Sequence, residues 1–262
     1  MPKSLEQFDM NQNISSEKEE KLSHIYEGLK KYEDESFGID SGIGIDASIK
    51  DTVAYLNAFD FNTVESCSGH LTHGSLSPRV AIEASEKPKW RFIGQKEVFE
   101  KVALKHRVTL EEVFEHTKPK YDLSLEDRDV QPKNAEQIGA VWDEGWDSTP
   151  KEEETEEFKL WRKKTDELAG QLDSLTQEFY EGRSVEGENS KLVVEKHDDP
   201  ELPHVYNYFL HNGGEDYLVM VDPGERAKLS EEEMNVLKKR LEANQKEMKD
   251  FTEFLKEKYN SH

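Results

Sequence analysis

Residues 61–84 read FNTVESCSGHLTHGSLSPRVAIEA. The β-favouring residues at 61–65 predict one strand, and the alternation of apolar and polar residues over 79–84 predicts a second strand. The small and polar residues between the two are typical of a loop. We expect a functional site in this loop, because α/β folds commonly place their sites in loops that leave the ends of strands.

Two helices are predicted before this stretch. Ser16 and Glu19 have the spacing of a capping box, and apolar residues follow at helical intervals, which predicts a helix over 16–34. Residues 1–14 are polar, and we expect them to be loose. Asp46 is a candidate N-cap for the second helix, which ends before the first strand.

Beyond the second strand, the apolar spacing predicts a helix over 95–106, and Thr109 with Glu112 forms a capping box for a shorter helix. Residues 118–150 contain three prolines, two tryptophans and many charges without a sustained period. We therefore expect a linker or a long surface excursion at 118–150.

The C-terminal part of the chain has the order helix, three strands, helix. These elements are predicted at residues 152–181, 192–194, 205–210, 217–221 and 230–259. The sequence Asn-Gly-Gly at 212–214 supplies residues that favour positive φ, as a hairpin turn requires.

These patterns predict an α+β protein. Its N-terminal α/β region carries the strand-loop-strand site, and its C-terminal region is a pair of long helices that bracket a small antiparallel sheet. The expected regions are an N-terminal helix at 1–36, the α/β region at 37–117, the linker at 118–150 and the α-β-β-β-α region at 151–262.

Composition and charge narrow the function classes. The chain has 57 acidic and 35 basic residues and a formal net charge of −22, so broad nucleic-acid binding is not expected. Its single cysteine excludes an intrachain disulfide and a four-cysteine zinc site within one chain. No stretch has the apolar character of a signal peptide or a membrane helix, so we expect a cytoplasmic protein without a membrane segment.

The loop at 65–74 gathers the only cysteine, two histidines and two glycines of this region. One interpretation is a cradle for a small polar or anionic ligand, in which backbone N–H groups and hydroxyls point inward and a nearby arginine supplies the countercharge. The candidate ligand-binding residues are Asp46, Ser66, Ser68, Gly69, His73 and Arg79.

A second interpretation is a metal site. Cys67, His70 and His73 form a C-x2-H-x2-H cluster of ligand types that suit zinc. A fourth ligand is available from Asp40, Asp46 or Glu65. The spacing matches no closed zinc finger.

A third interpretation is nucleophilic catalysis, with the thiolate of Cys67 as nucleophile and His70 or His73 as base. Cys67 and His70 are therefore the candidate catalytic residues. The competing structural interpretation is that Cys67 is buried and only closes a turn, because a lone cysteine is among the residues most often buried. Whether the loop is catalytic, only binds a ligand or is structural stays open at this point.

The order of Asp46, a helix, a strand that ends in Ser-Cys-Ser-Gly at 66–69, and a further strand resembles the tRNA wybutosine-synthesizing protein 3-like family. The resemblance spans residues 38–84. It implies an α/β enzyme that takes part in methyl transfer from S-adenosylmethionine during the modification of a tRNA guanosine. In that family an arginine follows Ser-Cys-Ser-Gly, whereas this chain has His70, so an imidazole replaces a fixed cation.

An alternative function of a different class is a protein-protein interaction module with a structural Cys67 loop. Its long amphipathic helices, and exposed positions around Trp142, Trp146 and Trp161, would then bind a protein partner. The remaining histidines are scattered, and for His211 we expect a surface or capping role.

Overall fold

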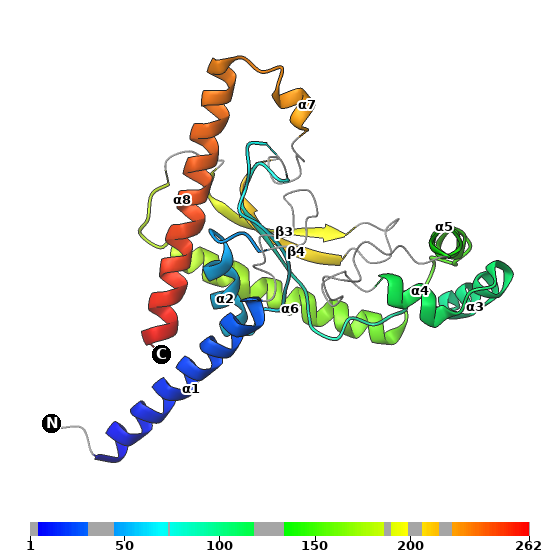
Figure 1. Ribbon diagram of the computed structural model, residues 1–262. Coiled ribbons are helices and arrows are strands. Elements are labelled where there is room, and N and C mark those ends of the chain that lie inside the picture. The colour runs from blue at the N-terminus through cyan, green and yellow to red at the C-terminus, as the bar shows by residue number, and fades with distance from the viewer. Residues whose placement is uncertain are drawn as a thin grey trace. The chain divides into compact units, whose positions relative to one another are not determined.

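The computed structural model describes residues 5–30, 45–72, 74–117, 134–185, 190–198, 206–214 and 222–261. The chain divides into two compact units, whose elements are labelled in Figure 1. The first unit is built from the residues up to Ala84, from Thr165–Asp198 and from Tyr206–His262. The second unit is built mainly from Ser85–Lys164.

A four-stranded sheet lies in the first unit, with the strand order β1-β2-β4-β3. Its strands are β1 (Thr63–Cys67), β2 (Arg79–Ile82), β3 (Leu192–Asp198) and β4 (Tyr206–Asn212). Each pairing is antiparallel, and β2 pairs with β4. This confirms the α+β class. It differs from the predicted separation of an N-terminal α/β region and a C-terminal sheet, because the strands of both regions form one sheet.

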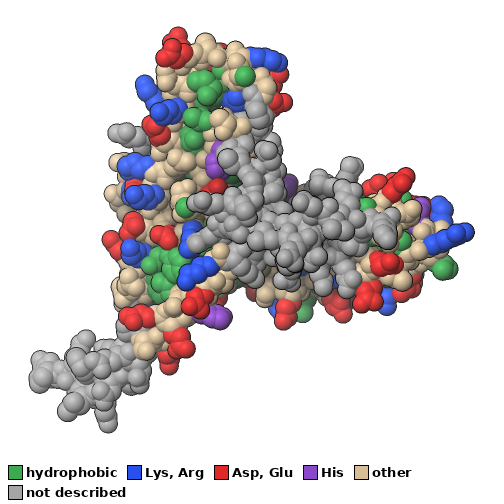
Figure 2. All heavy atoms as spheres, in the orientation of Figure 1, with side chains coloured by type: hydrophobic (Ala, Val, Ile, Leu, Met, Phe, Trp, Pro, Cys, Tyr) green, Lys and Arg blue, Asp and Glu red, His purple; other side chains and the backbone are tan. Residues whose placement is uncertain are grey.

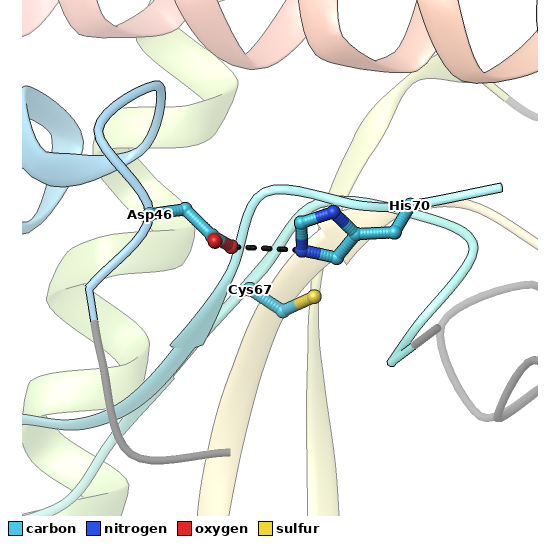
Figure 3. A group of neighbouring side chains, drawn as sticks. All are labelled: Asp46, Cys67 and His70. Atoms are coloured by element: carbon cyan, nitrogen blue, oxygen red, sulfur yellow. Dashed lines mark hydrogen bonds and ion pairs between the residues drawn. The ribbon is translucent and has the colours of Figure 1, made fainter. Parts of the chain in front are cut away.

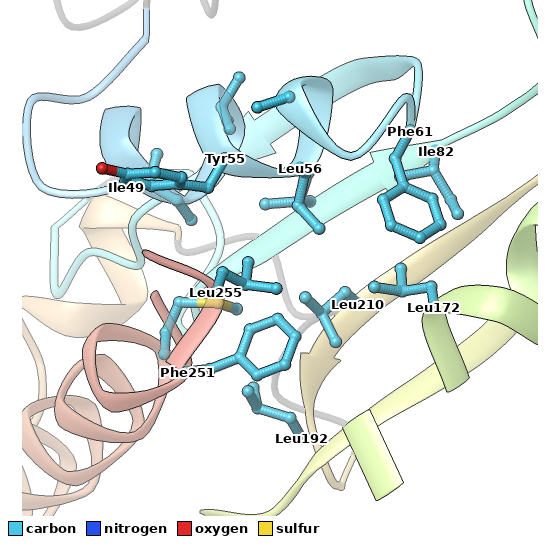
Figure 4. Close-up of a cluster of buried hydrophobic side chains, with 14 of the residues drawn as sticks. Ile49, Tyr55, Leu56, Phe61, Ile82, Leu172, Leu192, Leu210, Phe251 and Leu255 are labelled. Atoms are coloured by element: carbon cyan, nitrogen blue, oxygen red, sulfur yellow. The ribbon is translucent and has the colours of Figure 1, made fainter. Parts of the chain in front are cut away.

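The core of the first unit joins helices from both ends of the chain to this sheet. The helices are α1 (Leu5–Lys30), α2 (Lys50–Ala58), the part of α6 (Glu156–Phe179) from Thr165 onward, and α8 (Glu231–Ser261), with the short α7 (Pro223–Arg226) before it. Figure 4 shows Leu56 of α2, Leu210 of β4 and Phe251 of α8 in one cluster. All three are completely buried, and each such side chain stabilises the fold by about 1.5–3 kcal/mol.

The long helices and two C-terminal strands confirm the sequence predictions, with two corrections. α1 begins at Leu5, so the predicted loose segment 1–14 and helix start near residue 16 are wrong from Leu5 onward. Ser16 therefore lies inside α1, and its capping-box spacing with Glu19 does not mark the start of the helix. The strand predicted at 217–221 lies outside the described residues.

The second unit has its own core, formed by α3 (Gln95–His106), α4 (Leu110–Thr117) and α5 (Ala135–Asp147). The ring of Phe99 is completely buried and contacts Trp142 edge to face at 5.3 Å between centroids. α3 and α4 confirm the predicted helices. The predicted linker at 118–150 is wrong for the residues of α5, because Ile138 and Val141 pack into this core; residues 118–133 lie outside the described part of the chain.

The tryptophans proposed as exposed partner-binding positions are mainly core residues. Trp146 is 8% exposed and Trp161 is 3% exposed, and the Trp142 ring packs against Phe99 and Phe114. The prediction of exposed positions around Trp142, Trp146 and Trp161 is therefore wrong for Trp146 and Trp161 themselves, because both side chains are buried. In the part of the chain that is described, no helix is both long enough and apolar enough to span a bilayer.

Candidate functional site

Cys67 is the last residue of β1, and the register of the sheet determines which way it faces. Cys67 pairs with Arg79, whereas Ser66 pairs with Val80, which is buried under the helices. Because side chains alternate along a strand, Ser66 faces the helix-covered side and Cys67 faces the other side. The strand therefore separates these two candidate residues.

The loop after Cys67 turns back sharply at two glycines. Gly69 has a φ of +80° and Gly74 has a φ of +62°, both in the left-handed region that favours glycine. A Cβ on Gly69 would lie 2.9 Å from the backbone nitrogen of Pro78, so only glycine fits there. The His70 N–H donates to the Ser75 carbonyl at 2.8 Å and closes the turn.

α8 holds this loop from the C-terminal end of the chain. The Gln245 side-chain amide donates to the carbonyls of Ser68 and Gly69, each at 3.1 Å. The buried Asn244 amide donates to the hydroxyl of Ser77 at 2.8 Å. Two neighbouring residues of one helix therefore bind both arms of the loop.

Asp46 approaches the loop from the turn before α2. Its carbonyl accepts the N–H groups of Ile49 and Lys50 at 3.0 and 3.2 Å, which anchors its backbone at the start of α2. Its carboxylate does not cap the helix as predicted: the residue at the N-cap is Ile49, and no side chain caps there. The carboxylate instead accepts the backbone N–H of Ser68 at 2.9 Å.

Three ionisable side chains converge at this point. His70 Nε2 lies 3.0 Å from Asp46 Oδ2, and one ligand atom from each of Asp46, Cys67 and His70 lies within 4.8 Å of the other two. Figure 3 shows the sulfur of Cys67 toward the same edge of the imidazole as the nitrogen that contacts Asp46. We refer to these three side chains as the Asp-Cys-His cluster. Two of its side chains stay accessible, since that of Asp46 is 35% exposed and that of His70 is 21% exposed.

The electrostatics of the cluster favour charged forms. The hydrogen bond to Asp46, and next the one to Cys67, raise the pKa of His70 to about 10, although burial opposes this. Partial burial acts to raise the pKa of Asp46, but hydrogen bonds from His70 and Ser68 outweigh it and lower the pKa to about 2. Burial likewise acts to raise the pKa of the Cys67 thiol, but contacts with His70 and the Gly69 N–H outweigh it and lower that pKa.

The structure brings some of the other predicted site residues to the cluster and leaves others out. Ser68 and Gly69 contribute backbone N–H groups, the second to Cys67 Sγ at 3.4 Å. Arg79 lies on the Cys67 side of the sheet but forms an ion pair with Glu65 and stacks over the ring of Phe209. His73 and Asp40 lie outside the described residues.

His211 lies beside Arg79, on the neighbouring strand β4. It pairs with Arg79 in the β2–β4 register, and its Nε2 lies 3.2 Å from Glu195 Oε2. The predicted surface or capping role is wrong, because His211 is completely buried, and this burial lowers its pKa. Because its neighbours on the sheet are an arginine and a partly exposed glutamate of the protein itself, we assign His211 a structural role beside the cluster.

Sequence reasoning finds all three members of the Asp-Cys-His cluster but misses the residues that hold it. Gln245 and Asn244 lie in the middle of α8, and their polar side chains look like ordinary surface positions of an amphipathic helix. No local pattern marks them, because their partners lie 167 to 177 residues away in the chain.

A cavity of about 480 Å³ lies in the second unit. It is lined by Arg91, Phe92, Lys151, Glu152, Glu153, Glu154 and Lys159. Arg91 contacts Glu154 at 3.1 Å, Arg162 contacts the same carboxylate at 2.7 Å, and Lys159 pairs with Glu156. These charges are matched within the protein, so the cavity is a weaker candidate than the cluster.

Along α8 in Figure 2, basic and acidic side chains alternate over the described residues, and no continuous basic stripe is visible on that face.

Searches of family models, curated proteins and solved structures find no match to this chain. The class of protein is therefore defined by the fold and the cluster alone: an α+β protein with an aspartate, a cysteine and a histidine gathered at one strand end.

Proposed function

We propose that the loop at 65–74 is a ligand-binding or catalytic site whose reactive group is the sulfur of Cys67. The observation that carries this proposal is the convergence of Asp46, Cys67 and His70 within 4.8 Å of one another. A cysteine that only fills a turn needs no histidine and carboxylate beside it. Partners of this kind are found where a thiol reacts or binds.

The chemistry available to the cluster follows from its contacts. An imidazolium next to the sulfur stabilises the thiolate, and the Asp46 carboxylate holds the imidazole in place at 3.0 Å. The thiolate is then available to a small polar or anionic ligand that reaches the partly exposed loop. The tRNA wybutosine-synthesizing protein 3-like resemblance makes S-adenosylmethionine the first compound to test and methyl transfer the first reaction.

Alkylation of the single cysteine tests this proposal. Chelator-treated protein is incubated with iodoacetamide at pH 7, and intact-mass spectrometry follows the addition of one label per chain. We expect His70→Ala to slow the labelling several-fold, because the loss of the imidazole removes a contact that lowers the pKa of the Cys67 thiol. Asp46→Asn should slow it less, because it loosens the imidazole without removing it.

The matched control is His106→Gln. His106 Nε2 contacts Glu144 Oε2 at 2.9 Å in the second unit, so it is a histidine-carboxylate pair without a cysteine. This variant should label at the wild-type rate. Equal labelling rates for wild type and His70→Ala, with unchanged circular dichroism, would refute the reactive sulfur and leave a structural loop. Calorimetric titration with S-adenosylmethionine, for wild type and Cys67→Ser, then tests that cofactor separately.

The alternative function, docking of a protein partner, is favoured by one feature of α8. None of the residues at 231–240 is buried, and Leu241 is the first buried residue of this 31-residue helix. Val236 in this part is 57% exposed. Replacing Val236 by Glu and measuring self-association and pull-down of partners would test this function without disturbing the Asp-Cys-His cluster.

A further inference from the structure

We infer that Asp46, Cys67 and His70 bind one zinc ion and are its three ligands among the described residues. This inference rests on the proposed function, because it names the partner that the three side chains share. The structure shows them converging from two separate segments, the turn before α2 and the loop after β1.

The donor atoms select the metal. The cluster offers one sulfur, one imidazole nitrogen and one carboxylate oxygen. Zn²⁺ accepts all three ligand types, whereas Mg²⁺ and Ca²⁺ require oxygen ligands almost exclusively. A thiolate and a carboxylate together also carry two negative charges, which match the charge of the ion.

The distances fit a tetrahedral site. Zinc bonds of about 2.0 Å to nitrogen and oxygen and 2.3 Å to sulfur place neighbouring ligand atoms about 3.3–3.5 Å apart. The nitrogen of His70 and the oxygen of Asp46 are 3.0 Å apart, and no pair among the three ligand atoms exceeds 4.8 Å. Side-chain rotations that move these atoms by about an ångström therefore suffice to take up the ion.

The orientation of the imidazole distinguishes a metal site from a catalytic triad. In a nucleophile-histidine-carboxylate triad, the two ring nitrogens contact the two partners separately. Here Asp46 contacts Nε2, and Figure 3 shows the sulfur toward that same edge of the ring. Both partners therefore lie toward the same edge of the ring, as ligands of one ion do.

The surroundings hold these side chains in place, as a metal site requires. The Ser68 N–H donates to Asp46 Oδ2, and the Gln245 amide donates to the carbonyls of Ser68 and Gly69. Gly74 leaves room beside the cluster, since a Cβ there would lie 3.3 Å from His70 Cδ2 and 3.7 Å from Cys67 Sγ. The ligand side chains are thus supported from α8 and the loop itself.

Among the residues that the structure describes, three side chains offer ligand atoms at this point. A zinc site with three protein ligands is the open form, in which water or substrate completes the tetrahedron. The exposed fractions of the Asp46 and His70 side chains show that solvent reaches the cluster. A small anionic ligand, such as a carboxylate or a phosphate, is the class that would replace the water.

Metal titration of the full-length chain tests this inference. Protein freed of metal by a chelator is titrated with Zn²⁺ against a chromophoric competitor, and with Co²⁺, which gives a sulfur-to-metal charge-transfer band when a thiolate is bound. We expect one ion per chain. Cys67→Ser, His70→Gln and Asp46→Asn should each weaken zinc binding by more than about 100-fold, since even outer partners of ligands cost 10–100-fold.

Two controls separate folding from ligation. His106→Gln, which removes the histidine of the cysteine-free pair, should bind zinc as the wild type does. Cys67→Ser should keep the wild-type circular dichroism and lose the charge-transfer band with cobalt.

The outcomes distinguish this inference from the proposed function. If wild type binds no zinc while its Cys67 is alkylated faster than in His70→Ala, the metal site is refuted and the reactive sulfur stands. If zinc binds but Cys67→Ser binds it equally well, the metal lies elsewhere and the inference is also refuted. Absence of both zinc and rapid alkylation would refute both proposals.

Discussion

Thr52 and Thr252, which are 200 residues apart in the chain, share a buried hydrogen bond of 2.7 Å in the first unit. In the second unit, the cluster around Phe99 takes all its buried residues from the segment between 99 and 141. One core therefore closes only when both ends of the chain meet, whereas the other forms within a single segment. Long-range closure costs more loop entropy, so the first unit depends more heavily on each buried contact.

The same contrast holds for the two histidine-carboxylate pairs. His106 and Glu144 join two helices of the second unit, with Lys105 on the same carboxylate. His70 instead belongs to a loop that contacts α8, and Asp46 belongs to the turn before α2. Cys67 lies beside both. A histidine beside a carboxylate is thus common to both units, and the cysteine with its long-range support is what makes one of them a candidate site.

The largest expected effect breaks the core of the first unit. Phe251→Ala removes a completely buried ring that contacts Phe179 at 5.3 Å between centroids, and should cost about 3–5 kcal/mol. Urea unfolding followed by far-UV circular dichroism measures this loss. A cost below about 1 kcal/mol would mean that Phe251 is not packed as described.

Phe99→Ala is the matching change in the second unit and removes a completely buried ring of the same size. All four tryptophans lie within the second unit, so tryptophan fluorescence follows that unit. We expect Phe99→Ala to lower the fluorescence midpoint in urea more than Phe251→Ala does. The reverse order would contradict the assignment of these rings to separate cores.

A smaller effect should follow from adding a methyl group at two glycines with nearly the same φ. Gly94 before α3 has open space around it, so Gly94→Ala should cost only the strain of a positive φ, about 1–2 kcal/mol. Gly69→Ala would also press its Cβ against backbone atoms at 2.9 and 3.0 Å, which raises the cost to about 3 kcal/mol. Urea unfolding curves compare the two variants, and equal losses would show that the loop can relax around residue 69.

The smallest expected effect compares two helix caps. The Thr109 hydroxyl accepts the Glu112 N–H at 3.1 Å, and the Ser230 hydroxyl accepts the Glu233 N–H at 3.3 Å. Thr109→Ala should cost about 1 kcal/mol, because α4 has only eight residues and loses its first turn.

Ser230→Ala should cost less than about 0.5 kcal/mol, because the first turns of α8 precede its first buried residue and carry little packing. Thermal unfolding monitored by circular dichroism checks both values. A larger loss for Ser230→Ala than for Thr109→Ala would indicate that the N-terminal turns of α8 pack against something in solution.

Local patterns allowed much of the secondary structure to be predicted. The box of Thr109 and Glu112 and the apolar spacing over 95–106 place α3 and α4 correctly, since caps and helical periods act within one or two turns. α5 is missed because prolines and charges surround its apolar stripe, and only its contacts with α3 show that it is a core helix.

For the candidate site, the sequence by itself determined which chemistry is available: a cysteine, a histidine and an aspartate in segments with loop and turn signals. The tertiary structure decided which of the candidates meet. Pairing in β1 turns Ser66 away from Cys67, Arg79 turns to Glu65, and Asp46 leaves its expected cap to bind Ser68 and His70. The physical reason is the sequence distance over which each feature is set. Side-chain type and local period are properties of a few neighbouring residues, whereas the strand register and the hydrogen bonds of Gln245 to the loop form only when both ends of the chain pack together.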